Sequence, residues 1–269
     1  LLHCVYVDTG FMRKGETEEV REMFNEMGIE LQVVDASVRF FSNLEGITDP
    51  EEKRKVIGEQ FIRVFEEEQS NCGAKFLVQG TIAPDWIESG GGERDVIKSH
   101  HNVGGLPEDV DLKIVEPLRE FYKDEVRQIA RELGIKSSER QPFPGPGLAV
   151  RVLGDLTRPR VEACREACHI VETRLREAAE EGICDLPWQY FAALLPVRSV
   201  GVHGDARVHG ETVVVRAVTS LDGMSARYSP IPHDVLSAIS TEITNSLKGQ
   251  VNRVVYDITH KPPGTIEWE

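Results

Sequence analysis

The sequence has 269 residues, a length that suits one large domain or two ordinary ones. Its 31 Lys and Arg residues against 45 Asp and Glu residues give a formal net charge of −14 at pH 7. This charge argues against a general nucleic-acid-binding protein, which would carry a basic face. An anionic small substrate needs local basic clusters that overcome the acidic background. No apolar run reaches the roughly 18 residues of a membrane span and no signal peptide is visible, so we expect a soluble protein.

Five cysteines are scattered along the chain without a C-x-x-C pair, which favours a reduced, cytoplasmic compartment. Two of them, Cys164 and Cys168, stand near His169 and invite a metal-site interpretation. However, they fall in a series with spacings of three and four, which predicts one face of a helix. The members of that series are Val161, Cys164, Cys168, Val171 and Leu175. We therefore expect buried packing residues here rather than metal ligands.

The first half of the chain alternates predicted strands with predicted helices. The predicted strands are residues 2–7, 30–34, 75–78 and 112–115, and the predicted helices are residues 16–27, 49–69 and 119–133. This order is typical of an α/β domain with a mostly parallel sheet, which binds ligands at the carboxyl ends of its strands. The residues that follow two of these strands are therefore candidate ligand-binding residues: Asp8, Gly10, Gln79, Gly80 and Thr81. Ordinary strand-to-helix turns remain the alternative for each residue taken singly.

Residues 97–107 read IKSHHNVGGLP, a segment with no apolar period and several turn-forming residues. Lys98 and two adjacent histidines, His100 and His101, make it dense in cationic and proton-exchanging groups. Lysine binds phosphate as a point charge and histidine titrates near neutrality, as a lid over a polyphosphate requires. On these residues alone a solvated basic loop is an equally good interpretation.

Asp85 and Glu88 are spaced three residues apart, which places both carboxylates on one side of a helical turn. Mg²⁺ usually takes one or two carboxylates together with substrate phosphates, so this pair is a candidate magnesium site. The alternative is a pair of acidic residues at a helix start, where the helix dipole favours them.

Residues 141–148 (QPFPGPGL) contain three prolines and two glycines, which neither a helix nor a central strand accepts. We place a domain boundary here, between residues 1–147 and 148–269. Beyond it we predict helices at 159–181 and 233–247 and strands around 193–202, 211–219 and 252–258. Successive strands without a crossover helix favour an antiparallel α+β domain. In residues 212–217 (TVVVRA) apolar and polar residues alternate only weakly, which predicts a sheet covered on both faces. This second, smaller sheet has an apolar face and is a candidate dimer surface.

Several motifs occur together and in a specific order. They are VDTGFMRKGE, GTIAPDWIESGG, IKSHHNVGGLP, KIVEPLREFYKDEVR, QPFPGPGLAVRVLG and NRVVYDITHKPPGTIEWE. In this order they resemble GMP synthetase, and more closely its ATP-pyrophosphatase and dimerisation portion, over the whole chain. The resemblance implies a parallel-sheet α/β domain of the N-type ATP pyrophosphatase kind (adenine nucleotide alpha hydrolase-like), followed by a smaller α+β dimerisation domain that also binds XMP.

The sequence departs from the family pattern in two ways. The phosphate-binding loop of the family, Ser-Gly-Gly-Val-Asp-Ser, is absent, and residues 1–7 resemble the interior of a strand without a cap. We therefore expect a missing upstream segment of about 30 residues, one strand and one helix of a βαβ unit. The glutaminase domain is also absent, which predicts the synthetase subunit of a two-subunit enzyme whose amidotransferase is a separate chain.

The resemblance implies a purine-biosynthetic ligase that works in two steps. ATP adenylates the C2 oxygen of xanthosine monophosphate (XMP) with release of pyrophosphate, and ammonia then displaces AMP to give GMP. Charge builds up on the leaving pyrophosphate, so positioned cations and Mg²⁺ should carry most of the catalysis. Lys98 is the expected phosphate contact, with His100 and His101 as donors or bases. The strand-end residues are expected to bind ATP: Asp8, Gly10, Gln79, Gly80 and Thr81. The family's tail supplies the XMP site, and Lys261, Ile266 and Glu267 match it.

Two further residues match positions that the family uses for XMP. Arg54 matches an arginine, although a solvated helix charge is the alternative, and His203 stands where many relatives carry glutamine. We also expect a homodimer through the C-terminal domain, with neither a membrane nor a nucleic acid as partner.

The nearest alternative functions are those of other carbonyl-adenylating ATP pyrophosphatases: NAD synthetase, argininosuccinate synthetase and tRNA-thiolating enzymes. They lack the PFPGPG and KPPGTIEWE segments. A non-catalytic nucleotide-binding or scaffold subunit is the rival from another class.

Overall fold

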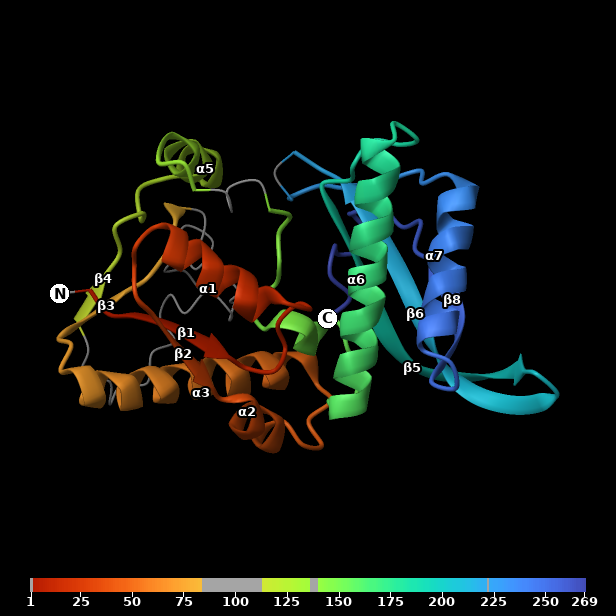
Figure 1. Ribbon diagram of the computed structural model, residues 1–269, viewed down its shortest axis with the longest axis horizontal. Coiled ribbons are helices and arrows are strands. Elements are labelled where there is room, and N and C mark those ends of the chain that lie inside the picture. Colours follow the sequence, from red (N-terminus) through yellow and green to blue (C-terminus); the bar gives the residue numbers. More distant parts are fainter. Residues whose placement is uncertain (1, 84–112, 136–139, 222) are drawn as a thin grey trace.

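The computed structural model describes residues 2–83, 113–135, 140–221 and 223–269. Figure 1 shows two parts side by side, an N-terminal part of short strands among helices and a C-terminal part of long strands beside two helices. None of the helices in the described residues is long and apolar enough to cross a membrane.

The N-terminal part contains two pairs of parallel strands. The first pair is β1 (Cys4–Asp8) and β2 (Leu31–Asp35), joined through α1 (Glu16–Glu26). The second pair is β3 (Phe76–Val78) and β4 (Lys113–Val115). The expected parallel α/β character is therefore confirmed. The expected single sheet is not found, because within the described residues the two pairs form separate two-stranded sheets.

Helix α3 (Pro50–Cys72) underlies these strands and has clear start and stop signals. The Asp49 carboxylate accepts a hydrogen bond from the backbone N–H of Glu52 at 2.9 Å, which caps the helix. Proline fits the first turn because its missing N–H has no helical partner there. Gly73 ends the helix at φ 70°, a left-handed conformation that favours glycine.

Two other helices lie in the described residues of this part. The short α2 (Ser37–Asn43) follows β2 directly and buries Phe40, and the sequence analysis did not predict it. The last helix, α5 (Lys123–Glu132), is shorter than the predicted 119–133.

The C-terminal part begins with the 3₁₀ helix η2 (Gly147–Val150) and the long α6 (Arg158–Glu180). Its sheet contains β5 (Gln189–His203), β6 (Ala206–Thr219), β7 (Arg227–Tyr228) and β8 (Val251–Tyr256). β6 pairs antiparallel with β5 and β7 but parallel with β8. The predicted antiparallel pairing is therefore confirmed for β5, β6 and β7, whereas the parallel pairing of β8 was not predicted. Helix α7 (His233–Ser246) acts as the crossover that a parallel neighbour requires.

Helices α6 and α7 lie next to each other against this sheet (Figure 1). The predicted apolar face of α6 is confirmed, because Val161, Cys164, Cys168, Val171 and Leu175 are all buried. Both thiols, Cys164 and Cys168, donate hydrogen bonds to the backbone oxygen of Ala192, as packing residues rather than metal ligands. Residues 212–218 of β6 are buried without a break, as the weak alternation predicted.

The two parts meet in one continuous apolar core. Phe11 and Phe40 from the first part belong to the same buried cluster as Leu148 and Leu194. Gly147 lies at φ 65°, where a Cβ would come within 2.4 Å of the backbone oxygen of Phe11, so only glycine fits. The proposed boundary after residue 147 remains a prediction, and the residues around it lie in a tightly packed junction.

Candidate nucleotide site

The last thirteen residues, 257–269, form a tail held by three cationic side chains without exposed surface: Lys53, Arg151 and Arg216. Arg216, on β6, donates hydrogen bonds to four backbone oxygens of the tail, those of Asp257, Thr259, Thr265 and Ile266. Its guanidinium also lies 3.2 Å from an oxygen of the Asp257 carboxylate. A buried arginine is tolerated because its donors are satisfied in this way.

Glu267 is held on the tail by a two-pronged contact with Arg151, a residue that follows η2. The Nε and Nη2 atoms of Arg151 donate to the two Glu267 oxygens at 3.1 and 2.8 Å, and Gln189 Nε2 donates at 2.6 Å. Burial lowers the pKa of Arg151, but the Glu267 charge and its hydrogen bonds more than offset this, so the net pKa is raised. The Glu267 side chain keeps 20% of its surface exposed, which leaves it reachable from solvent.

The Arg151 guanidinium packs between aromatic rings. Its central carbon lies 4.1 Å from the ring centre of Phe191 and 5.0 Å from that of Phe143. Such contacts fix the plane of the guanidinium. The orientation of the Glu267 carboxylate is therefore set by groups that have little freedom to move.

The other tail residues assigned to XMP are also ordered by contacts. Lys261 pairs through its backbone with Ala226, beside β7, and its Nζ donates to the backbone oxygen of Gly223 at 2.8 Å. Ile266 is buried, with 9% of its surface exposed. The structure thus places Lys261, Ile266 and Glu267 on one anchored segment.

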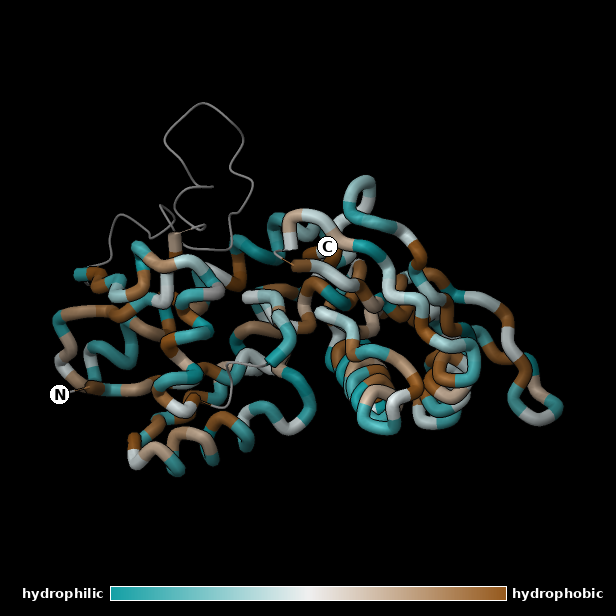
Figure 2. Tube along the Cα trace, turned by 90° about the horizontal axis from the view of Figure 1, so that it is seen from above, coloured by the Kyte–Doolittle hydropathy of each residue, from teal (hydrophilic) through white to brown (hydrophobic). Residues whose placement is uncertain are grey.

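Arg54 and His203, also assigned to XMP, lie on different elements. Arg54 is on α3, next to the buried Lys53 that contacts the tail, and its guanidinium lies 3.6 Å from Glu51. His203 is at the tip of the β5–β6 hairpin, where it pairs with Ala206. Figures 1 and 2 show this hairpin projecting from the C-terminal part, so His203 is not brought to the tail of its own chain.

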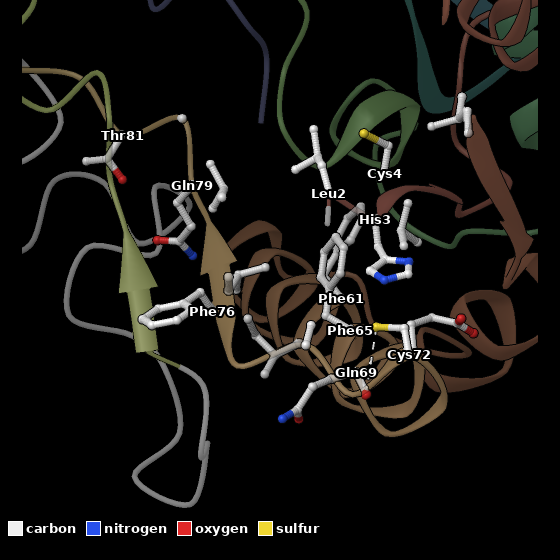
Figure 3. A pocket seen from close by; sticks show the side chains of 18 of the residues that line it. Leu2, His3, Cys4, Phe61, Phe65, Gln69, Cys72, Phe76, Gln79 and Thr81 are labelled. Atoms are coloured by element: carbon white, nitrogen blue, oxygen red, sulfur yellow. Dashed lines mark hydrogen bonds between the residues drawn. The ribbon is translucent and has the colours of Figure 1, made fainter. Parts of the chain in front are cut away.

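A cavity of 1090 Å³ opens between β1 and β3, with α3 as its floor. Figure 3 shows Leu2, His3 and Cys4 on one side, Phe76 on the other, and Phe61 and Phe65 between them. Gln79, Gly80 and Thr81, the residues assigned to ATP after β3, line this cavity together with Arg54. Its lining combines apolar rings with a smaller number of polar groups, as small-molecule sites commonly do.

The other two residues assigned to ATP, Asp8 and Gly10, line a second cavity of 320 Å³. The Asp8 carboxylate accepts hydrogen bonds from the backbone N–H of Gly10 at 2.9 Å and from Thr17 Oγ1 at 2.8 Å. Four basic side chains line this cavity (Arg13, Lys14, Arg158 and Arg165), and so do five acidic ones: Asp8, Glu16, Glu18, Asp35 and Glu162. The predicted ATP residues are therefore divided between two cavities rather than gathered in one.

The expected lid and magnesium residues cannot be placed. Lys98, His100, His101, Asp85 and Glu88 all lie outside the described residues. Within the residues that are described, no group of three or more His, Cys, Asp or Glu side chains is arranged to hold a metal ion.

Five residues that hold the tail in place were not predicted from the sequence: Lys53, Arg151, Gln189, Arg216 and Glu269. A signal was present for two of them. Arg151 and Arg216 each stand alone in an apolar run, GLAVRVLG and TVVVRA. Because charged residues are almost never fully buried without partners, such an arginine predicts a buried polar contact.

Comparison with known proteins agrees with the resemblance seen in the sequence. The family model described as "GMP synthase C terminal domain" matches residues 176–268. A glutamine-hydrolyzing GMP synthase subunit of Thermoplasma acidophilum is 55% identical over all of this chain and 85% of its own length. The corresponding subunit of Thermococcus kodakarensis is 58% identical with the same coverage. An undivided glutamine-hydrolyzing GMP synthase of Caldicellulosiruptor saccharolyticus is 55% identical, and this chain spans 53% of it. The chain therefore belongs to the GMP synthase family and corresponds in sequence to the subunit that these archaeal relatives represent.

Proposed function

We propose that this chain makes GMP from XMP, ATP and ammonia. ATP transfers its adenylyl group to the C2 oxygen of XMP and releases pyrophosphate. Ammonia then attacks C2, and AMP leaves with that oxygen. The observation that carries the proposal is the identity of 54 to 58% to GMP synthase subunits over the whole chain. The anchored tail supports it, because it presents a fixed carboxylate and a lysine.

XMP is assigned to the tail and to α3. Glu267 is oriented by Arg151 and Gln189, so it accepts hydrogen bonds from a ribose hydroxyl or a base N–H in a defined direction. Lys261 is assigned to the 5′-phosphate, and Arg54 adds a second cation. A dianionic nucleotide needs such local charges because the chain has a formal net charge of −14. Ile266, the third tail residue assigned to XMP, is buried beside Glu267 in the chain.

ATP is assigned to the ends of β1 and β3, through Asp8, Gly10, Gln79, Gly80 and Thr81. The cavity beside β3 is large enough for a nucleotide. The cavity beside β1 has four basic side chains that can contact phosphates, although they stand among five acidic ones. Lys98 is proposed to contact the leaving pyrophosphate, with His100 and His101 as proton donors or bases of the adenylation step. Asp85 and Glu88 are proposed to hold Mg²⁺, which would neutralise charge on the phosphates.

Two partners are part of the proposal. Ammonia comes from a separate glutamine amidotransferase, as the names of the archaeal relatives suggest, since each is called a subunit of a glutamine-hydrolyzing enzyme. The chain forms a homodimer through its C-terminal part, where Val197, Val200 and Val202 of β5 expose more than half of their surface. In such a dimer the projecting hairpin reaches toward the other copy, which is how His203 would serve an XMP site. A dilute-solution mass equal to one chain would contradict the dimer.

The test is to incubate the complete protein with XMP, ATP, Mg²⁺ and an ammonium salt, without glutamine, and to measure GMP. Formation of GMP with equal amounts of AMP and pyrophosphate is expected. Absence of GMP would remove the assignment and favour a non-catalytic role. Production of another amidated or thiolated compound would favour a different ATP pyrophosphatase.

The lid has its own test. Lys98→Ala should abolish XMP-dependent release of pyrophosphate while leaving the thermal unfolding midpoint unchanged, because the lysine is proposed to contact phosphate alone. A wild-type rate in this variant would show that Lys98 does not contact the reacting phosphates.

A further inference from the structure

Lys53 lies in the first turns of α3, and its side chain has no exposed surface. Its Nζ donates hydrogen bonds to Glu269 Oε2 at 2.6 Å, to the backbone oxygen of Val152 at 2.9 Å and to that of Ala149 at 3.4 Å. An ammonium group has three N–H donors, so every donor of Lys53 has a partner.

Glu269 completes a junction of three chain segments. One carboxylate oxygen accepts from Lys53, the other accepts from the backbone N–H of Gly154 at 3.3 Å, and only 7% of the side chain is exposed. The pair therefore ties together the helix α3, the segment that follows η2, and the end of the tail.

A buried ion pair of this kind is a poor way to gain stability. Removing two charges from water costs several kcal/mol, and apolar residues of similar size often do as well. Burial lowers the pKa of Lys53, which shows that the surroundings disfavour the charged form even though the hydrogen bond to Glu269 opposes the shift. What an ion pair supplies that apolar packing does not is a fixed distance and register between the two segments.

The segments joined by this pair are those assigned to XMP. Arg54 is the neighbour of Lys53 on α3, and Glu267 stands two residues before Glu269 on the tail. We propose that Lys53 and Glu269 are positioning residues of the XMP site. Their ion pair sets the tail against α3 and thereby sets Glu267 relative to Arg54. This inference rests on the proposed function, since it assumes that XMP is the nucleotide bound by the tail.

The main test is Glu269→Gln, which removes the charge and keeps the shape. We expect the KM for XMP to rise about tenfold, while kcat at saturating XMP stays within about twofold. The KM for ATP should not change, because the ATP residues lie on other elements. Glu269→Asp keeps the charge on a shorter side chain and should recover part of the lost affinity.

Two control variants sharpen this test. Lys55→Met removes an exposed lysine of the same helix, whose Nζ lies 2.9 Å from Glu52, and should leave all three constants unchanged. The exchange of Lys53→Glu with Glu269→Lys should not restore the wild-type KM for XMP. In that double variant the backbone oxygens of Ala149 and Val152 would face a carboxylate instead of an ammonium.

A Glu269→Gln enzyme that unfolds at a lower temperature but keeps the wild-type KM for XMP would overturn the inference, since that is a purely structural role. Absence of GMP from the wild-type enzyme would instead remove the proposed function. If the variant does not fold, the inference is tested by hydrogen exchange of the wild-type protein, measured with and without XMP. XMP should slow exchange in residues 50–57 and 261–269 together, and slowing in the tail alone would overturn the inference.

Discussion

The C-terminal sheet and the N-terminal strand pairs bury their apolar side chains to very different extents. In β6, residues 212–218 are buried without interruption. In β3, Phe76 and Val78 each expose 56% of their surface, and Ile114 and Val115 of β4 expose 37 and 40%. Strands of parallel sheets are ordinarily covered on both faces. The two halves of the molecule therefore differ in how completely their sheets are packed.

The two halves therefore differ in rigidity as well as in packing. The packed half holds the tail through Arg216 and Arg151, so that Glu267 has one orientation. The N-terminal half leaves a cavity of 1090 Å³ between β1 and β3, at the strand ends assigned to ATP. A rigid site for XMP beside an open site for ATP would suit the proposed enzyme, which must align two nucleotides.

The largest effect is expected for Arg216→Met. The variant leaves several tail oxygens and the Asp257 carboxylate without their buried partner, so unfolding free energy should fall by about 3 to 5 kcal/mol. Chemical denaturation measures this loss. Arg207→Met, at an exposed position of the same strand, is the control and should change stability by less than about 0.5 kcal/mol. Equal effects of the two variants would show that Arg216 does not hold the tail.

A matched pair of valine substitutions compares the two halves directly. Val215→Ala removes two methyl groups from a side chain that is 1% exposed, and should cost about 2 kcal/mol of unfolding free energy. Val78→Ala does the same at 56% exposure and should cost less than about 0.5 kcal/mol. A large loss for Val78→Ala would mean that another segment covers the face of β3.

The smallest effect concerns alkaline pH. Burial raises the pKa of Tyr6 on β1 from 10.0 to about 12. Between about pH 10 and 12, the Tyr6 hydroxyl loses its proton in the unfolded chain but keeps it in the folded one, so the free energy of unfolding falls as pH rises. Tyr6→Phe should move the alkaline unfolding midpoint to slightly higher pH and leave stability near neutral pH almost unchanged. It should not abolish alkaline unfolding, because burial also raises the pKa of Tyr256. An unchanged alkaline midpoint would contradict this.

Local signals in the sequence predicted the long elements well. Asp49 and Pro50 marked the start of α3, and the spacing of Val161, Cys164 and Cys168 predicted the buried face of α6. In each case neighbouring residues alone determine the structure. The seven-residue α2 was missed because two turns are too short to show a clear apolar period.

The pairing of strands that are far apart in the sequence was not predicted. The parallel register of β8 on β6 depends on contacts between residues about 40 positions apart, such as Thr212 and Arg253. The same holds for the candidate site. The tail residues were predicted through family resemblance, whereas Lys53 and Glu269 are 216 positions apart, and no local pattern joins them.

Adenylation of XMP at its C2 oxygen can be followed with XMP that carries a heavy oxygen isotope at that position. The complete enzyme would turn over with ATP, Mg²⁺ and ammonia, and mass spectrometry would follow the label. We expect the label to appear in the phosphate of AMP, because that oxygen leaves with the adenylyl group. Label in free phosphate, pyrophosphate or water, with none in AMP, would contradict it.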